Sequence, residues 1–309
     1  MRLVTVLALM FGVSSCNSQS EKARLEDQLK GTAQEVSEPA PSFAPAKKLG
    51  KLKNKKLDEV SGLAASVANP GLFWVLNDSG NKPEIYLIDE ETNIVQTYAL
   101  KGVRNRDWEE IAVGPGPETG KQYIYVGEIG DNLAIHPYKY IYRFPEPVYA
   151  SDEDKETIDV TRFDTITFAL SDERRDTEAF VVDPVTRDIY VIAKWKSPVD
   201  VYQLRFSDLA KNPAIAEHVG TLPISTVVAA DFSRDGTELL IKNYDKIFYW
   251  KRPVNTPVMK MLQKAAIEIP YEREPQGESI AWSADGDGFY TVSEQKKNED
   301  VHLLYYRRQ

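Results

Sequence analysis

The 309-residue sequence is poor in cysteine and histidine. It contains one cysteine and three histidines. A single cysteine excludes an internal disulfide framework, a thiolate zinc site and an iron–sulfur cluster, because each takes at least two cysteines from one chain. His136, His218 and His302 stand far apart in the sequence and form no pair with the spacing of zinc ligands. Packing and hydrogen bonds must therefore hold the fold together.

A basic surplus is also missing. The sequence has 38 Lys and Arg against 47 Asp and Glu, which gives a formal net charge of −9. Nonspecific binding to phosphate backbones needs clustered Lys and Arg that release counterions. We therefore expect no nucleic-acid partner. No Gly-x-Ser-x-Gly motif occurs either, so the familiar covalent hydrolase chemistry lacks a serine nucleophile.

The first residues have the pattern of an export signal. Arg2 precedes the apolar run Leu3–Val13, which is shorter than the ~20 residues that cross a bilayer. Val13–Cys16 resembles the bacterial lipobox, in which the cysteine is acylated and the chain is cut just before it. We predict a signal peptide over residues 1–15 and lipidation of Cys16, with an ordinary secreted protein as the alternative. The lipid would hold an exported lipoprotein to a membrane, in the periplasm or at the outer-membrane surface.

The segment 16–46 is rich in Ser, Gln, Glu and Pro and has few large apolar side chains. Such a composition cannot bury enough surface to offset the entropy of ordering. We predict a disordered tether here, followed by one domain over residues 47–309. We expect this domain to be monomeric.

From Glu59 onward the sequence predicts an all-β domain. Short runs rich in Val, Ile, Tyr, Phe and Trp alternate with Gly, Pro, Asn and Asp, and no long stretch has a helical period. A small or acidic pair followed by an apolar residue opens each repeat. These openings are Ser61–Ala64, Glu109–Ala112, Glu178–Val181, Ala230–Ser233 and Glu278–Ala281. Their spacing of roughly 50 residues, lengthened once by the acidic insert Ser151–Glu156, is near the period of four-stranded propeller blades.

The repeat predicts a β-propeller of four-stranded blades, with five blades and six as the alternative. A second, a third and, in four of the repeats, a fourth strand follow each opening. The last repeat lacks a fourth strand, and Lys48–Lys53 can supply it from the start of the domain. A ring closed by its N-terminal strand leaves no exposed sheet edge.

Three segments resemble motifs of a secreted or lipid-anchored bacterial β-propeller family: Asn77–Gly80, Asp107–Gly114 and Gly127–Asn132. The turns Phe232–Gly236 and Trp282–Gly286 resemble those of periplasmic WD40-like propellers of the TolB type. Both resemblances imply the fold and are silent about chemistry. A looser similarity to phytase-like and esterase-like propellers, based on topology and acidic strand ends, implies phosphoester chemistry with calcium.

Polar residues converge on one face of the predicted ring, where the innermost strands start and the second strands end. The expected ligand-binding residues are Asp78, Glu109, Glu110, Glu128, Asp131, Asn132, Glu178, Lys194, Lys242, Glu278 and Glu294, with Arg104 and Arg175 from connecting loops. Asp107 and Asp231 belong to the same convergent positions. Carboxylates so close together raise one another's pKa unless cations lie between them.

Two classes of function remain open. The first is a noncatalytic envelope lipoprotein whose channel face binds a protein or glycan partner. The second is a calcium-dependent hydrolase of the phosphoesterase or lactonase type, in which four carboxylates hold Ca²⁺ and activate water. These four are Glu110, Glu128, Asp131 and Glu294. A structural role is open as well, in which the same charges form an ion-pair network between blades.

Overall fold

β-Branched and aromatic residues make most of the chain extended. The computed structural model describes residues 41–150, 156–195, 197–295 and 299–309. The predicted signal peptide and the predicted lipidation site, Cys16, lie outside these residues. Within the described ranges no helix is long and apolar enough to cross a membrane.

Twenty-one strands, β1 to β21, make up the described fold, and they recur in a fixed order from a centre outward. The strands nearest the centre, called the inner strands, are β2 (Val60–Ala65), β6 (Trp108–Pro115), β11 (Thr177–Val182), β15 (Val227–Phe232) and β19 (Ser279–Trp282). The second strands are β3 (Phe73–Asn77), β7 (Gln122–Glu128), β12 (Ile189–Ala193), β16 (Glu238–Asn243) and β20 (Gly288–Val292). The third strands are β4 (Glu84–Ile88), β8 (Lys139–Pro145), β13 (Val199–Leu204), β17 (Ile247–Lys251) and β21 (His302–Arg307). The outer strands are β5 (Ile94–Leu100), β10 (Asp164–Leu170), β14 (Ala214–Leu222), β18 (Ile267–Ile269) and β1 (Lys47–Lys51), with β9 (Thr157–Val160) beyond β5.

The described strands form four sheets. One runs β2-β3-β4-β5-β9, one β15-β16-β17-β18 and one β19-β20-β21-β1. The remaining sheet has eight strands, because the outer strands β10 and β14 pair in parallel and join two four-stranded groups. Every other neighbouring pair is antiparallel except β5 and β9, so hairpins connect the inner three strands of each group.

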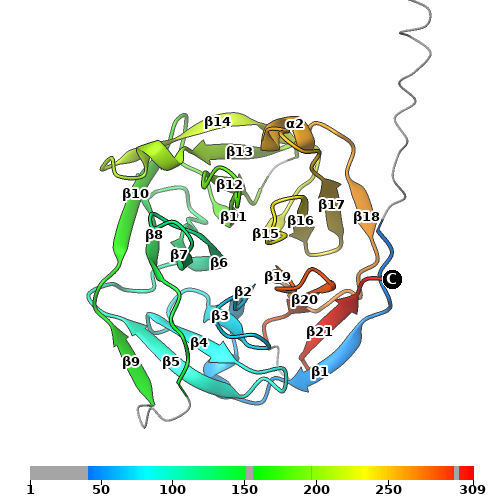
Figure 1. Ribbon diagram of the computed structural model, residues 1–309. Coiled ribbons are helices and arrows are strands. Elements are labelled where there is room, and N and C mark those ends of the chain that lie inside the picture. The colour runs from blue at the N-terminus through cyan, green and yellow to red at the C-terminus, as the bar shows by residue number, and fades with distance from the viewer. Residues whose placement is uncertain (1–40, 151–155, 196, 296–298) are drawn as a thin grey trace, which may run out of the picture. The chain divides into compact units, whose positions relative to one another are not determined.

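The inner strands gather around one centre, as Figure 1 shows. β2 packs beside β6, β6 beside β11, β11 beside β15, β15 beside β19, and β19 beside β2. Glycine permits the closest of these approaches, since a Cβ at Gly62 would lie 2.9 Å from the backbone nitrogen of Ile111. The domain is thus all-β and β-propeller-like.

Hydrophobic clusters fill the spaces between neighbouring groups of strands. Trp74 of β3 and Trp108 of β6 are fully buried in one of them. Another joins the first group to the last, where the rings of Phe73 and Tyr290 meet edge to face at 4.6 Å between centroids. Burial of such large aromatic side chains is the main favourable contribution to a fold without disulfides.

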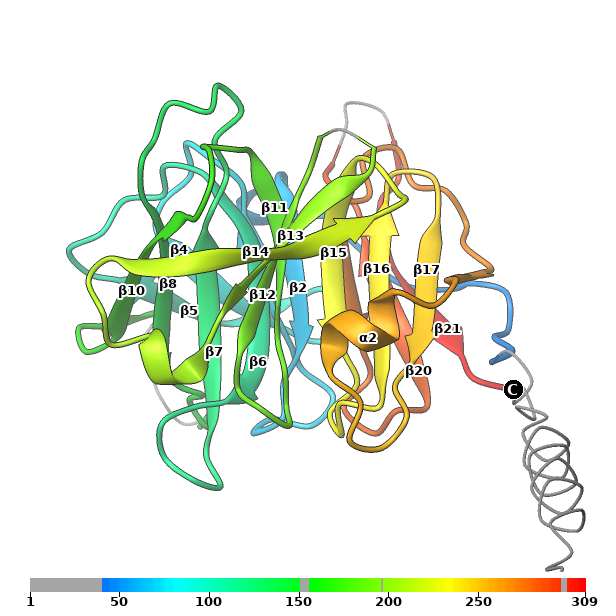
Figure 2. The same ribbon diagram turned by 90° about the horizontal axis from the view of Figure 1, so that it is seen from above.

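The described residues contain few helical turns. The helix α2 (Val258–Leu262) packs on the outer side against β14 and β17 (Figures 1 and 2). Two short 3₁₀ helices, Lys55–Leu57 and Phe206–Asp208, lie in connections.

The folded domain begins earlier than residue 47, the boundary that composition predicts. Phe43 is only 5% exposed and packs edge to face on Phe289, with 5.0 Å between ring centroids. The backbone N–H of Ala44 donates to Arg307, so residues from about 42 onward extend the edge beside β21. The predicted pairing of the N-terminal strand does occur, because β1 lies antiparallel to β21. Strand β9, in contrast, was not predicted.

Candidate functional site

A shared irregularity brings acidic residues to one end of the inner strands. β2, β6, β11 and β15 each carry a β-bulge at the second residue. The bulged residues are Ser61, Glu109, Glu178 and Val228. A bulge adds one residue and changes the direction of its side chain. The adjacent side chains of Glu109 and Glu110 therefore point to different parts of the fold. Glu278, just before β19, holds the matching register.

The bulge also corrects the register of the fourth repeat. The sequence pattern places its opening at Ala230, whereas the bulge lies at Val228, two residues earlier. The sequence pattern missed the bulge because Val228 and Ala229 are apolar. The pair Ala230-Asp231, followed by Phe232, matches the opening pattern instead. Asp231 consequently lies near the far end of β15 and not among the acidic residues at its start.

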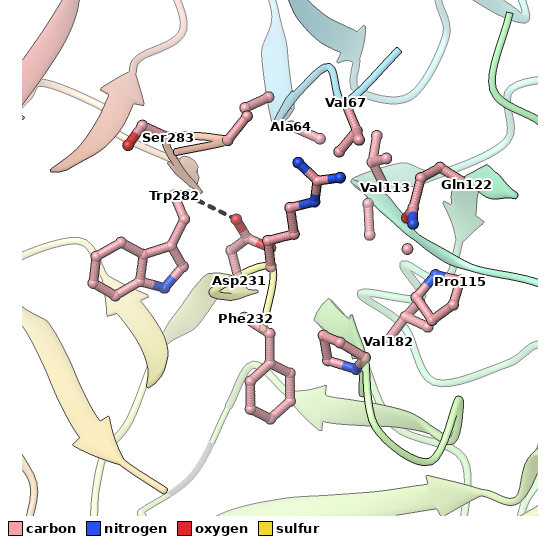
Figure 3. A pocket seen from close by; sticks show the side chains of 16 residues that line it. Ala64, Val67, Val113, Pro115, Gln122, Val182, Asp231, Phe232, Trp282 and Ser283 are labelled. Atoms are coloured by element: carbon pink, nitrogen blue, oxygen red, sulfur yellow. Dashed lines mark hydrogen bonds between the residues drawn. The ribbon is translucent and has the colours of Figure 1, made fainter. Parts of the chain in front are cut away.

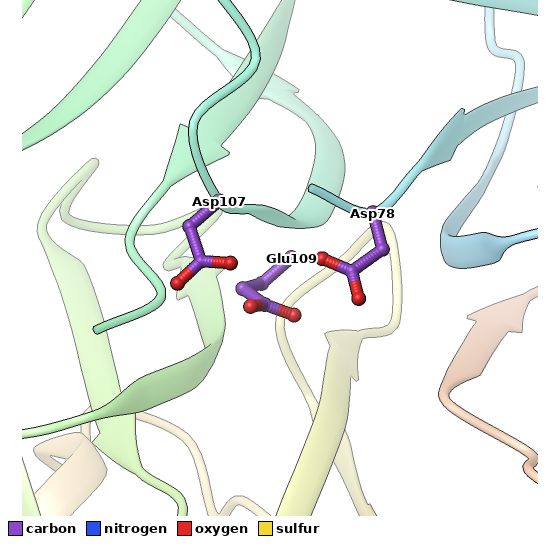
Figure 4. Close-up of side chains that lie close together, drawn as sticks. All are labelled: Asp78, Asp107 and Glu109. Carbon is purple, nitrogen blue, oxygen red and sulfur yellow. The ribbon is translucent and has the colours of Figure 1, made fainter. Parts of the chain in front are cut away.

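Three carboxylates form the tightest group at this end. One oxygen from each of Asp78, Asp107 and Glu109 lies within 4.8 Å of the others. Figure 4 shows Glu109 between the two aspartates. Gly130 makes room for them, because a Cβ there would collide with carboxylate oxygens of Asp107 and Glu109. Asp78 directly follows β3 and Asp107 directly precedes β6, so the second and inner strands of adjacent groups build the cluster together.

Lys194 forms an ion pair beside the three-carboxylate cluster. The amino group of Lys194, at the end of β12, lies 2.7 Å from Oε1 of Glu178. The Glu178 carboxyl also lies against that of Glu109. This ion pair connects the three-carboxylate cluster to the next inner strand. Lys194 further lies 5.2 Å from the ring centre of Trp195, within the range of a cation–π contact.

The fifth inner strand contributes a second carboxyl pair. Glu278 accepts a hydrogen bond of 2.6 Å from the hydroxyl of Tyr244, and the Glu294 carboxyl lies against it. We call the whole assembly the acidic mouth. It consists of Asp78, Asp107, Glu109, Glu178, Glu278 and Glu294.

Burial and mutual repulsion raise the pKa values of most of these carboxyls. Burial, followed by the charges of neighbouring acids, raises the pKa of Asp107 to about 6 and that of Glu294 to about 8. The pKa of Glu178 rises to about 8 through burial, even though Lys194 opposes the shift. Burial and the Glu178 charge raise the pKa of Glu109 well above its ordinary value. Burial and mutual repulsion thus disfavour full ionisation of the acidic mouth near neutral pH.

Two members of the predicted calcium quartet have backbone partners of their own. Glu110 is buried and accepts hydrogen bonds of 3.1 Å from the N–H groups of Ile111 and Ala230. Asp131 accepts from the N–H groups of Ile135 and His136 and so shapes the turn after β7. Neither carboxylate joins the acidic mouth.

A third member, Glu128, lies on the outer side of β6. Its Oε2 accepts from the indole N–H of Trp108 at 3.3 Å and from the hydroxyl of Tyr142 at 3.0 Å. Arg106 approaches its other oxygen at 3.5 Å. Of the predicted quartet, whose four residues the structure describes, Glu294 alone belongs to the acidic mouth.

Lys242, another predicted cation, lies close enough to Glu278 of the acidic mouth for that charge to act on its pKa, whereas Arg104 and Arg175 lie on loops. Lys242 is fully buried, donates to the carbonyl of Gly277 and lies 4.7 Å from the ring centre of Tyr271. Burial lowers its pKa to about 8. Arg175 forms ion pairs of 2.9 Å with Asp172 and 3.1 Å with Asp200, and Arg104 is exposed on the loop before β6.

An exposed tryptophan borders the acidic mouth. Trp195 is 49% exposed, and its indole N–H donates to Oδ2 of Asp176 at 2.9 Å, which fixes the ring plane. It lines a pocket of about 240 Å³ together with Asn132 and Arg174. The predicted residue Asn132 thus lies in this side pocket. Trp108, in contrast, is buried between neighbouring groups of strands.

Sequence reasoning left two contributors out of the predicted ligand set. Asp107 was placed in the convergent ring but not among the ligands, although it completes the tightest carboxylate group. Tyr244 was not considered. A signal existed, since Tyr244 directly follows β16 just as Lys194 directly follows β12 and Asp78 directly follows β3.

Comparisons with known proteins add little to this geometry. No protein-family model matches the chain, and no curated protein matches it. A solved structure that the chain resembles is that of the PQQ-bound form of aldose sugar dehydrogenase from Streptomyces coelicolor. The match has 13% sequence identity and a TM-score of 0.49, and it covers 87% of this chain and 100% of that one.

Proposed function

We propose that this protein is a noncatalytic binding module of the bacterial cell envelope. In this proposal a five-bladed β-propeller holds a divalent cation of the Ca²⁺ class at the acidic mouth and binds a glycan or protein partner on the surrounding face. The single observation that carries it is the convergence of Asp78, Asp107 and Glu109 within 4.8 Å of one another.

The packing of the inner strands supports five blades. Each inner strand contacts two others in cyclic order, and β19 contacts β2. A hydrophobic cluster containing Leu63 and Tyr290 spans the first and last groups of strands. Pairing of β1 with β21 supports closure of the ring by the N-terminal strand, which protects an edge that would otherwise attract other strands.

The chemistry of the acidic mouth favours a hard cation. Calcium takes six to eight oxygen ligands, and carboxylates are its preferred protein donors. Lys194 already forms an ion pair with Glu178. Arg106 and Lys139 act on Asp107, but burial and the charges of Asp78 and Asp176 outweigh them and raise its pKa. A bound cation would offset the repulsion that now raises the pKa values of the three-carboxylate cluster.

The surroundings favour a glycan over a protein as the partner. The face of Trp195 is half exposed and held in place by Asp176, and aromatic faces suit the apolar faces of sugar rings. Its pocket also presents the polar side chains of Asn132 and Arg174 to sugar hydroxyl groups. Lipidation of Cys16, which we retain as part of the proposal, would keep this face close to a membrane.

A direct test measures metal content and thermal stability. We expect the purified protein to hold one Ca²⁺ per chain, and calcium added after chelation to raise the melting temperature by on the order of 5 °C. Glu109→Gln removes a ligand charge, and Gly130→Ala fills the space beside the carboxylates while leaving every charge in place. Both variants should lose the shift.

The matched control is Glu118→Gln, an exposed glutamate on the turn between β6 and β7 that pairs with Lys121. It should keep the full calcium response. Absence of stoichiometric metal together with no thermal shift in the wild-type protein would contradict the proposal.

The alternative function is a calcium-dependent hydrolase. One observation favours it: burial raises the pKa of Glu178, beside the carboxylate cluster, to about 8, a range suited to a general acid near neutral pH. The calcium-loaded protein would then turn over phosphoester or lactone substrates, and Glu178→Gln would abolish turnover without removing the metal. Calcium binding with no turnover across such a panel would leave the binding module as the function.

A further inference from the structure

The far ends of the inner strands differ from the acidic mouth. Three residues beyond the bulge position the strands carry Ala64, Ala112, Val181 and Ala281. The matching residue of β15 is Asp231. A single carboxyl group therefore stands in a layer of small apolar side chains. Strand geometry sets this layer on the order of 10 Å from the bulges.

Asp231 lines a pocket of about 120 Å³, which we call the opposite pocket (Figure 3). Every inner strand contributes to its wall. Apolar lining residues include Ala64, Val113, Val182, Phe232 and Trp282. The pocket therefore combines apolar side chains with the carboxyl group of Asp231 and other polar groups, Gln122 and Ser283 among them. This combination recognises a ligand with one charged end and a short hydrocarbon body.

The carboxyl group of Asp231 has a backbone partner and lacks a counter-ion. Its Oδ2 accepts a hydrogen bond of 2.7 Å from the backbone N–H of Trp282. Over the described chain no ion pair links Asp231 to a lysine, arginine or histidine. The neighbouring Glu110 on β6 is also acidic, and burial raises its pKa well above the ordinary value. Burial raises the pKa of Asp231 to about 7, as expected for a carboxyl without a cation.

We propose that the opposite pocket binds a primary alkylammonium group, with the carboxylate of Asp231 as its counter-ion. The group can come from a free aliphatic amine or from a lysine side chain of a partner protein. This proposal concerns the far end of the inner strands and does not depend on calcium at the acidic mouth.

Other ligand classes fit the pocket less well. A metal ion needs several oxygen ligands, and Asp231 is the one carboxylate among the lining residues. An anionic ligand would meet the repulsion of the Asp231 carboxylate, which lines the pocket. Arg234 also lines the pocket, but it is exposed, so water screens its charge. A buried carboxylate is stabilised most by a cation that fills the pocket beside it.

Calorimetric titration of the full-length protein at pH 8 tests this assignment. The probes are n-butylamine, with 1-butanol and butyrate as matched ligands that lack the positive charge. We expect butylamine to bind at least tenfold more tightly than either. Equal binding of butanol or butyrate, or no binding of butylamine at millimolar concentration, would overturn the proposal.

Substitutions locate the site. Asp231→Asn should weaken butylamine binding at least tenfold, whereas Arg234→Gln should keep or strengthen it. Val67→Phe fills the pocket from its partly exposed rim without touching Asp231, so it tests occupancy if Asp231→Asn does not fold. Unchanged binding by a folded Asp231→Asn variant, or by Val67→Phe, would overturn the assignment. Glu109→Gln should leave amine binding unchanged.

A final arm distinguishes the two sources of the ammonium group. Nα-acetyl-lysine methylamide carries the same butylammonium chain on a peptide backbone. Tighter binding of this compound than of butylamine supports a lysine side chain of a protein partner. Tighter binding of butylamine supports a free amine. Failure of both overturns the proposal.

Discussion

The acidic mouth and the buried Asp183, which follows the far end of β11, use acidic residues in opposite ways. At the acidic mouth, bulges and strand ends crowd six carboxyl groups around Lys194. At the far end, Asp183 has a buried partner, because Arg252 contacts its Oδ1 at 2.7 Å. The acidic mouth has more carboxyl groups than cations, whereas Arg252 compensates the charge of Asp183. The first arrangement is suited to binding a cation, whereas the second is an ion pair that holds neighbouring strands together.

Breaking the compensated pair should give the largest effect. Arg252→Met leaves Asp183 buried without its cation, and Asp183 is completely inaccessible to solvent. We expect the free energy of unfolding to fall by about 3 to 5 kcal/mol. Chemical denaturation at pH 7 measures this loss. A decrease below about 1 kcal/mol would show that the pair contributes little to the fold.

Changing the pH should have an intermediate effect on the free energy of unfolding, and this effect should arise at the acidic mouth. The folded-state pKa values of Asp107, Glu178 and Glu294 lie near 6 to 8, above their ordinary values of 3.8 and 4.5. Their contribution to stability is therefore complete below about pH 4 and is lost as the pH rises through 6 to 8. We expect the calcium-free protein to lose on the order of 2 kcal/mol of unfolding free energy between pH 5 and 8.

Calcium should reduce that loss, because it stabilises the ionised carboxylates. Lys194 stays charged through this range: burial lowers its pKa, but the ion pair with Glu178 outweighs burial and raises it. Denaturation curves at several pH values, with chelator and with calcium, provide the measurement. Stability that rises from pH 5 to 8 in chelator would contradict the assignment of protons to the acidic mouth.

Replacing one carboxyl group of the acidic mouth with an amide should have the smallest effect on the free energy of unfolding. The sign of this effect should be opposite to that of Arg252→Met. Glu109 is buried beside other carboxyls, so Glu109→Gln removes repulsion. We expect the calcium-free protein to gain up to about 1 kcal/mol at pH 8. A clear loss of stability would indicate that Glu109 serves a structural network and not a cation site.

The strands of the fold could be predicted from the sequence, whereas their local register could not. Runs such as Ile189–Ala193 combine β-branched residues with flanking turn residues, and the structure has a strand over those residues. The bulge at Val228 leaves no mark in an apolar run, so the pattern slipped to Asp231. Likewise, alternation cannot tell which of Glu109 and Glu110 reaches the acidic mouth, since a bulge interrupts it.

Contacts between segments that lie far apart in the sequence could not be predicted either. Phe43 lies in a Pro-rich and Ala-rich run, and its burial depends on a surface that Trp282 and Phe289 form at the other end of the chain. The predicted quartet failed to converge for a similar reason. Glu128 and Asp131 lie within two residues of Gly130, which packs against carboxylates of the acidic mouth, yet Trp108 and the turn after β7 hold their carboxylates elsewhere.

In the proposed function, protons occupy the acidic mouth until a divalent cation replaces them. Calorimetric titration with calcium at pH 7, in buffers of low and high ionisation enthalpy, tests it most directly. We predict one Ca²⁺ bound per chain with release of at least one proton, both lost in Gly130→Ala. No binding at millimolar calcium, or binding that releases no proton, would contradict the account.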